Sequence, residues 1–186
     1  MKTLFFIVSG LLLLILTMIA GMFVWARFSD GPMGPIAGGA LETGQYVEAA
    51  DADWRSLLGD KPVVEIELQL ESTGTSRTTG AFTNNGHLYV PCDLGYVWRR
   101  LPNGVARLAL HTMWMLKDWH LEALEDGRVV VRTMGNRYKL NAVRVTDEEL
   151  LEDFRQHVIH AAAGAFELLD VQTNPKDIWF FRLDPR

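Results

Sequence analysis

The residues best suited to chemistry in this sequence lie in the run Ser76-Arg77-Thr78-Thr79. A guanidinium presents its N–H groups in a planar fork that matches the oxygens of a phosphate or a carboxylate. Arg77 is therefore the first candidate for binding an anionic group, with the Ser76 hydroxyl and backbone amide beside it. The competing interpretation is a plain strand, because threonines favour extended structure. The residues alone leave both interpretations open.

The histidines offer a second kind of chemistry, which is metal binding. His157 and His160 stand three residues apart on a predicted helix and could share an ion, but nothing nearby completes a ligand set. His111 and His120 point to different sides of another predicted helix and cannot form one site unaided. No metal site is therefore predicted. The sequence also lacks the G-x-S-x-G, P-loop, H-E-x-x-H and C-x-x-C motifs.

Composition and charge narrow the class of protein. The chain has 186 residues, of which 48% are hydrophobic and 22% charged, as in a folded domain. Its formal net charge is −5, and its dense charge run, residues 147–153, is acidic. Nucleic-acid binding requires a basic surface, so no nucleic-acid partner is expected. The single cysteine, Cys92, cannot form an internal disulfide and is expected to be a small buried residue.

The N-terminal segment is long and apolar. No residue between Thr3 and Ala26 is charged, and a helix of this length extends about 36 Å, which exceeds the bilayer core of about 30 Å. A cleavable signal peptide is the alternative, but its apolar region would be shorter and would end in an A-x-A-like site. Here Ala20-Gly21 is followed by further apolar residues. A single-pass membrane anchor over residues 1–28 is therefore predicted.

The charges that flank this segment predict its orientation. Lys2 and the terminal amine precede it, while Arg27 follows it with Asp30 close behind. The positive-inside bias places the amino terminus in the cytoplasm, on a difference of about one charge. We therefore expect the protein in the inner (cytoplasmic) membrane of a bacterium, with its domain in the periplasm.

Residues 29–62 form a second segment with a composition of its own. The stretch Gly31-Pro32-Met33-Gly34-Pro35-Ile36-Ala37-Gly38-Gly39 disfavours helix through its prolines and permits tight turns through its glycines. It could be a spacer that lifts the domain off the bilayer. It could equally pack against the domain as a fixed arm, because Met33 and Ile36 provide apolar surface to bury. A short helix is expected over residues 51–58.

Residues 63–186 are expected to form one domain. Residues 63–70 alternate apolar and polar side chains, which is typical of a strand with one face in water. Two hairpins are predicted, because Asn84-Asn85-Gly86 and Met134-Gly135-Asn136 contain residues that tolerate positive φ angles between strand-like runs. Those runs are residues 78–83 and 88–92, then 128–133 and 138–145.

Helices and a last strand complete the prediction. Residues 105–124 contain no Pro or Gly, and their apolar side chains recur at helical spacing. Thr146 and Glu149 match a capping box for a second helix, whose apolar stripe covers residues 150–161. Residues 178–183 are rich in aromatic side chains and predict a buried strand. The expected class is α+β and mainly antiparallel.

With this order of elements, the sequence resembles the split β-barrel of flavin-binding proteins related to pyridoxamine phosphate oxidase. Within that superfamily it looks like the deazaflavin-dependent nitroreductase and quinone reductase family, over about residues 63–186. The matching residues are Ser72-Thr73-Gly74, Arg77-Thr78-Thr79, Leu88-Tyr89-Val90-Pro91, Trp119, Asp126-Gly127-Arg128-Val129, Gly135-Asn136-Arg137-Tyr138, Ala142-Val143-Arg144-Val145-Thr146-Asp147 and Trp179-Phe180-Phe181-Arg182-Leu183. The resemblance implies a split β-barrel fold.

Two departures from this family bear on function. Family members place a longer basic Gly-Ser loop between the first two strands to hold cofactor phosphates, whereas here two residues separate Gly74 from Arg77. Arg77 is thus the only cation in this loop. The second departure is an insertion at about residues 95–117, which adds a long apolar helix. This helix could close over a pocket, pack on the membrane or bind a partner.

The resemblance implies a membrane-anchored oxidoreductase that moves a hydride between a flavin or deazaflavin (FMN or the deazaflavin coenzyme) and a quinone or nitro compound. Membrane anchoring suits a lipid-soluble quinone. The residues that would hold the cofactor are Ser76, Arg77, Thr78 and Thr79 at its anionic end, with Tyr89, Tyr96, Trp98 and Trp119 as candidates to stack on its ring. Aromatic residues at such spacing are more often part of the core.

The alternative is a non-enzymatic, membrane-tethered module that has kept the barrel and lost the cofactor. It would bind a protein partner, or a haem-like ligand through His111 or His120. The shortened loop before Arg77 favours this alternative. Both interpretations leave a homodimer open, because split barrels of this superfamily commonly pair. No catalytic residue is predicted for either.

Overall fold

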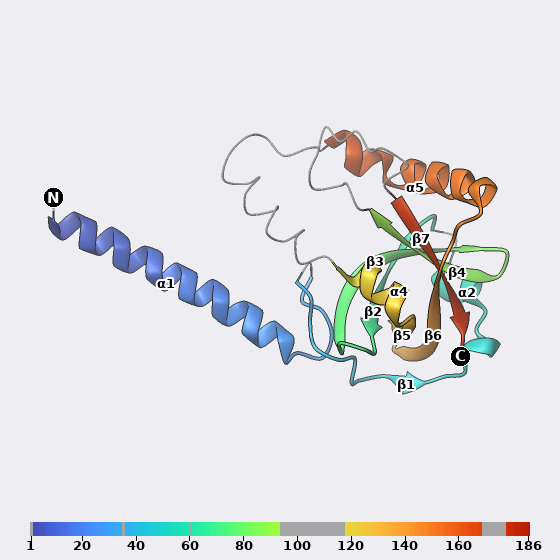
Figure 1. Ribbon diagram of the computed structural model, residues 1–186, viewed down its shortest axis with the longest axis horizontal. Helices are drawn as coiled ribbons and strands as arrows, with labels where there is room; N and C mark the ends of the chain where they lie inside the picture. The colour runs from blue at the N-terminus through green and yellow to red at the C-terminus, as the bar shows by residue number, and fades with distance from the viewer. Residues whose placement is uncertain (1, 35, 60, 94–117, 169–177) are drawn as a thin grey trace.

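The computed structural model describes residues 2–34, 36–59, 61–93, 118–168 and 178–186. The N-terminal elements are helix α1 (Lys2–Arg27), β1 (Gln45–Tyr46), the 3-10 helix η1 (Ala49–Asp51) and α2 (Trp54–Leu58). The remaining elements are β2 (Val64–Leu70), β3 (Thr75–Asn84), β4 (His87–Asp93), α4 (Trp119–Glu125), β5 (Arg128–Thr133), β6 (Asn136–Arg144), α5 (Glu148–Leu168) and β7 (Ile178–Pro185). Figure 1 shows α1 extending away from the strands.

Within the described residues, six strands close into a barrel. Their order is β6-β5-β2-β3-β4-β7, and β7 pairs back onto β6. Each of these pairings is antiparallel, whereas the short β1 joins β6 in parallel. Full closure removes the free strand edges that invite aggregation. The expected α+β fold with an antiparallel barrel is confirmed.

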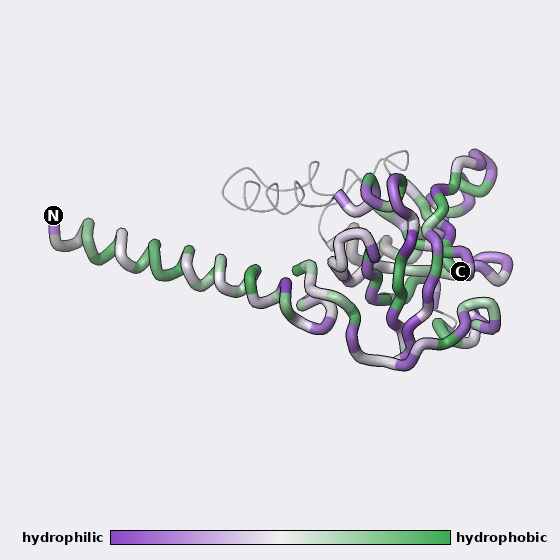
Figure 2. The backbone as a smooth tube through the Cα atoms, turned by 60° about the horizontal axis from the view of Figure 1, so that its bottom comes forward, coloured by the Kyte–Doolittle hydropathy of each residue, from purple (hydrophilic) through white to green (hydrophobic). Residues whose placement is uncertain are grey.

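Helix α1 is apolar along its length and contacts the rest of the chain through its last turn. The span Phe5–Arg27 has a mean hydropathy of 2.6 and is long and apolar enough to cross a membrane. Figure 2 shows this apolar stretch projecting clear of the barrel. Ala26 in the last turn is buried, and its carbonyl accepts a hydrogen bond of 3.1 Å from the Gly39 amide. The expected long N-terminal apolar helix is confirmed.

The core has two parts, which lie on the two faces of the barrel wall. The first includes the barrel interior, where Leu68, Val131 and Tyr138 pack with Trp54 of α2 and with α4. The second lies between the outer face of the barrel and α5, and it is largely aromatic. Cys92 is buried in the first part, as expected. Most of the apolar pattern in the sequence is explained by these two layers.

Several element boundaries differ from those expected. The short helix of residues 51–58 divides into η1 and α2, because Asp53 caps α2 by accepting a 3.2 Å hydrogen bond from the Ser56 amide. The cap of α5 is Asp147 and not Thr146, since the Asp147 carboxylate accepts bonds from two amides of the first turn. Of the helix expected over residues 105–124, the described part is α4; the inserted helix lies outside the described residues.

Residues 28–44, which we call the arm, lie against the barrel. Gly38 forms an isolated antiparallel bridge with Ser76 of β3: the Gly38 amide donates to the Ser76 carbonyl at 2.9 Å, and the reverse bond is 3.2 Å long. Met33 and Ile36 pair with each other in a small turn of the arm. Of the two roles open to this Gly- and Pro-rich stretch, the contacts show the packed arm.

Replacing Gly38 by alanine should detach the arm. A Cβ atom at this position would lie 1.8 Å from the carbonyl oxygen of Gly31 and 2.8 Å from the Cα atom of Pro32, and these backbone atoms cannot move aside cheaply. Overpacking of this kind costs about 1–3 kcal/mol, so limited proteolysis within residues 28–44 should accelerate about tenfold or more. Gly10→Ala is the control, since no atom lies within 4 Å of its added Cβ. Equal cleavage of the Gly38→Ala variant and the unaltered protein would contradict the packed arm.

Candidate functional site

The predicted binding run lies on β3, where its side chains alternate between the two faces of the barrel wall. Residues paired directly across antiparallel strands point to the same face. Arg77 pairs with the core residue Leu68, so Arg77 and Thr79 face inward. Ser76 and Thr78 consequently face outward. The four side chains therefore do not surround one common point, and their joint role in cofactor binding stays a prediction.

Arg77 and Trp119 are predicted site residues that the structure brings together. The Arg77 Cζ atom lies 5.7 Å from the centroid of the Trp119 ring, within the range of a cation–π interaction. Trp119 is the first residue of α4, and its buried ring packs 5.2 Å from that of Phe181. Trp119 is thus a core residue that also supports the guanidinium of Arg77.

Arg77 is partly buried and incompletely hydrogen-bonded. Its Nε atom is buried and has no hydrogen-bond partner in the described part of the chain. Burial lowers the pKa of Arg77, while the charges of Glu122 and Asp118 oppose that effect. Burial also raises the pKa of Glu122, and the charge of Asp118 adds to the increase. An anionic ligand could complete the hydrogen bonding of this cation.

Tyr89 lies in a different place, on the outer face of the barrel under α5. It pairs with Phe82 across β3 and β4, and the two rings stack at 5.6 Å. The Phe154 ring of α5 is 4.6 Å away, and burial raises the pKa of the Tyr89 hydroxyl. Tyr89 and Trp119 belong to separate core clusters, so they do not form two sides of one ring-binding slot. Tyr96 and Trp98 lie outside the described residues.

Ser76 is covered by the arm. Its side chain is fully buried, and its hydroxyl donates a 2.5 Å hydrogen bond to the carbonyl of Gly39. Its amide is already bonded to Gly38. Both groups that the sequence offers for an anion therefore bind the arm in this structure.

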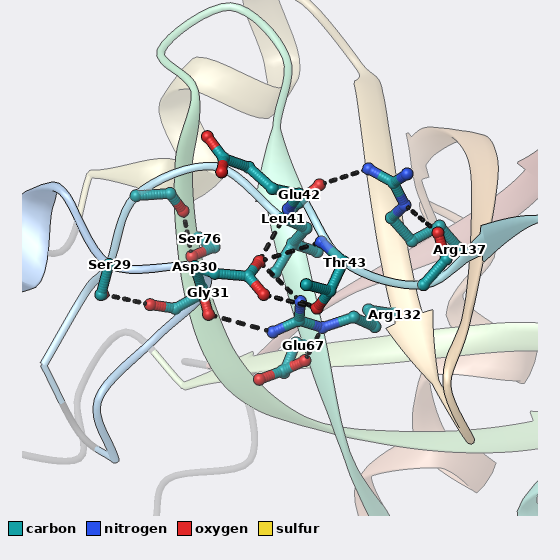
Figure 3. Close-up of polar contacts among 12 residues, drawn as sticks. Ser29, Asp30, Gly31, Leu41, Glu42, Thr43, Glu67, Ser76, Arg132 and Arg137 are labelled. Atoms are coloured by element: carbon teal, nitrogen blue, oxygen red, sulfur yellow. Dashed lines mark hydrogen bonds and ion pairs between the residues drawn. The ribbon is translucent and has the colours of Figure 1, made fainter.

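A charged network that the sequence analysis did not identify holds the arm in place (Figure 3). Arg132 of β5 donates from Nη1 to the Asp30 carboxylate at 2.7 Å and to the Thr43 hydroxyl at 2.8 Å, and its Nε pairs with Glu67 of β2. The Asp30 carboxylate also accepts 2.7 Å and 2.5 Å bonds from the Glu42 amide and the Thr43 hydroxyl. Arg132 thus connects two strands of the barrel to the arm.

The electrostatics of this network follow from its hydrogen bonds. Burial alone would raise the pKa of Asp30, but bonds from Thr43, Glu42 and Arg132 together hold it far below its usual range. The hydrogen bond to Glu67 raises the pKa of Arg132, against the effect of burial. The charges are therefore fixed at neutral pH. Alternation along residues 63–70 indicates that Glu67 faces outward, but the sequence does not show that Arg132 pairs opposite it.

An open cavity of about 870 Å³ lies beside the network, between the arm, α2 and the outer face of β2. Thr78, a predicted site residue, lines this cavity together with Lys61 and Met134. It therefore lies on the opposite face of the wall from Arg77.

The histidines have separate surroundings. The His157 Nε2 atom lies 2.6 Å from the carbonyl oxygen of Pro62, and its ring packs 5.0 Å from that of Phe82. His160 is exposed to solvent. In the part of the chain that the structure describes, no group of three or more His, Cys, Asp or Glu residues is placed to hold a metal ion. His111 lies outside that part.

Comparison with known proteins finds two distant likenesses of the barrel fold. A provisionally assigned pyridoxamine 5′-phosphate oxidase from Listeria innocua aligns with a TM-score of 0.43 and 13% identity, covering 70% of this chain and 89% of that one. An FAD-binding protein from Mesorhizobium loti aligns with a TM-score of 0.40 and 13% identity, covering 75% and 91%. No family model matches the sequence, and no curated protein matches it.

Proposed function

We propose that this protein is a membrane-anchored split barrel that binds a flavin or deazaflavin cofactor through Arg77 and acts as an oxidoreductase on a quinone or nitro compound. The observation that carries the proposal is the partly buried Arg77 guanidinium, whose Nε lacks a hydrogen-bond partner among the described residues. A buried donor left unpaired costs about 1–3 kcal/mol. A phosphate group would recover this loss through charge-assisted hydrogen bonds.

The residues present fit the anionic end of such a cofactor and not its ring. Tyr89 and Trp119 are packed in separate core clusters, and Ser76 is bonded to the arm. The contribution of the chain is therefore a fixed cation, supported by Trp119 and flanked by two carboxylates at the start of α4. When bound, a flavin or deazaflavin supplies hydride transfer, while the protein supplies position and electrostatics.

The proposal places α1 across the inner membrane and the barrel in the periplasm. Its support is the apolar length of α1 and the weak charge bias around it. A barrel held at the bilayer surface would meet a lipid-soluble quinone directly. A periplasmic barrel would also need its cofactor to be exported, so a topology reporter fused after Arg186 bears on the chemistry as well as on the location.

The test is cofactor binding by the intact protein. The visible absorption spectrum of protein purified from its own host should show a flavin or deazaflavin, and FMN or deazaflavin coenzyme should bind when added. Arg77→Met should weaken this binding about tenfold or more, because a hydrogen bond to a charged group contributes about 1.5–3 kcal/mol.

Arg128→Gln is the matched control, because Arg128 is an exposed arginine paired with Asp126 on the surface and should leave cofactor affinity unchanged. A colourless protein that binds neither cofactor would refute the proposal. Equal affinity of the Arg77→Met variant and the unaltered protein would remove Arg77 from the site.

The second candidate is the non-enzymatic tethered module. The observation that favours it is the arm, which bonds both the amide and the hydroxyl of Ser76 at the end of the shortened loop. This candidate predicts a spectrum without flavin or deazaflavin bands. It also predicts that Arg77→Met leaves capture of a protein partner intact.

A further inference from the structure

A second basic cavity, of about 470 Å³, lies between the end of β6, the start of α5 and the start of β7. Its lining includes Arg144, Glu148, Arg155, Ile178 and Trp179. None of these residues takes part in the site proposed at Arg77. The volume falls within the range of about 300–1,000 Å³ found for small-molecule sites.

Arg155 of α5 is buried in this cavity wall without good hydrogen-bond partners. The residue is 9% exposed, and its Nε atom has no hydrogen-bond partner among the described residues. Its Nη1 atom lies 3.5 Å from Glu148 and 3.6 Å from Glu152, whereas charge-assisted bonds are about 2.7–2.9 Å long. An arginine that served only as a surface ion pair of the helix would be exposed. Arg155 is instead a buried cation whose donors are underused.

Arg144 and Trp179 form another part of the wall. The Arg144 Cζ atom lies 3.6 Å from the centroid of the Trp179 ring, which is a close cation–π contact. The contact holds the planar guanidinium in place, so less side-chain freedom is lost when it binds a ligand. Ile178 and Trp179 add apolar surface beside the two cations.

We propose that this cavity is a ligand site for a small organic molecule that carries a carboxylate or phosphate group. The anionic oxygens lie between the guanidinium groups of Arg144 and Arg155, and the apolar part of the ligand packs on Ile178 and Trp179. Guanidinium groups bind such oxygens through two parallel N–H bonds. Glu148, whose side chain is 81% exposed, competes with the ligand for Arg155.

Calorimetric titration of the full-length protein in phosphatidylcholine nanodiscs tests the proposal, with succinate and inorganic phosphate as the two probes. At least one anion should bind the unaltered protein. Arg155→Gln should weaken that binding about tenfold or more. Glu148→Gln should tighten it by about two- to fivefold, because it removes an exposed competing carboxylate.

Arg128→Gln is again the matched control, since it removes an arginine paired with a carboxylate elsewhere on the surface. Failure of both anions to bind, or equal affinities for Arg155→Gln and the unaltered protein, would overturn the proposal. If the Arg155→Gln protein does not fold, Glu148→Gln decides, and an unchanged or weaker affinity in that variant overturns it. The readout does not depend on any flavin, so this site and the one at Arg77 succeed or fail separately.

The phosphate-bearing ligand could be a soluble molecule or a lipid headgroup. Repeating the titration in nanodiscs that contain phosphatidylglycerol separates the two sources. A lower apparent affinity for phosphate in these discs supports the site and identifies a headgroup as its occupant. An unchanged affinity supports the site and identifies a soluble anion.

Discussion

Replacing Phe154 by alanine should lower the free energy of unfolding by about 3–5 kcal/mol. Phe154 is a buried residue of α5, and its ring lies 4.6 Å from that of Tyr89, 5.1 Å from that of Phe82 and 5.5 Å from that of Phe180. These rings attach α5 to the outer face of the barrel. Alanine would leave a cavity the size of a ring, which the surrounding strands of a closed barrel cannot fill by moving inward.

The loss is measured by thermal unfolding in detergent, followed by circular dichroism. For a chain of this size 1 kcal/mol corresponds to about 2–4 °C, so the midpoint should fall by about 6–20 °C. Gln156→Ala on the same helix is the control: this side chain is exposed, and its loss should change stability by less than about 0.5 kcal/mol. A fall for Phe154→Ala no larger than that of the control would show that the aromatic cluster does not hold α5.

Replacing Arg132 by methionine should release the arm from the barrel and cost about 2–3 kcal/mol. Arg132 is 13% exposed, and its removal leaves the carboxylates of Asp30 and Glu67 without their cation. Breaking a fully buried pair costs about 3–5 kcal/mol, and we expect less here because both carboxylates are about one-third exposed. Methionine keeps most of the side-chain volume, so the effect is one of charge and hydrogen bonding.

Hydrogen exchange measures the release directly, because the arm amides of Gly38 and Glu42 are bonded in the packed state. Both should exchange about tenfold faster or more in the Arg132→Met protein. Arg128→Met on the same strand is the control, since its pair with Asp126 is more exposed and contributes about 0–1 kcal/mol. Unchanged exchange of both amides in the Arg132→Met protein would mean that the backbone bridge alone holds the arm.

Much of the fold could be predicted because its signals are local. Asn85 and Gly86, then Met134 and Gly135, adopt positive φ angles between 49° and 78° in the two predicted hairpin turns. The residues that allow those turns are adjacent in sequence, so they can be identified without knowing the rest of the structure. The same holds for β5, whose bounds, Arg128–Thr133, are those expected.

The candidate site could be predicted only in part, because it depends on which face of a strand each residue occupies. The run from Ser76 to Thr79 is continuous in sequence, yet pairing with β2 sends alternate side chains to opposite faces. Arg132 and Asp30 are 102 residues apart, and no local pattern joins them. Where the core interpretation of Tyr89 and Trp119 competed with ring stacking, burial in the two clusters favours the core.

The connection between α1 and the barrel has a mechanical consequence. The Arg27 guanidinium at the end of α1 donates hydrogen bonds of 2.8 Å and 3.2 Å to the carbonyls of Thr73 and Gly74, in the turn between β2 and β3. Together with the bond from Gly39 to Ala26, these contacts remove the swivel that a flexible tether would provide. Transmembrane helices tilt when their apolar length exceeds the bilayer thickness. With α1 in a bilayer, the barrel would turn with that tilt as a rigid lever.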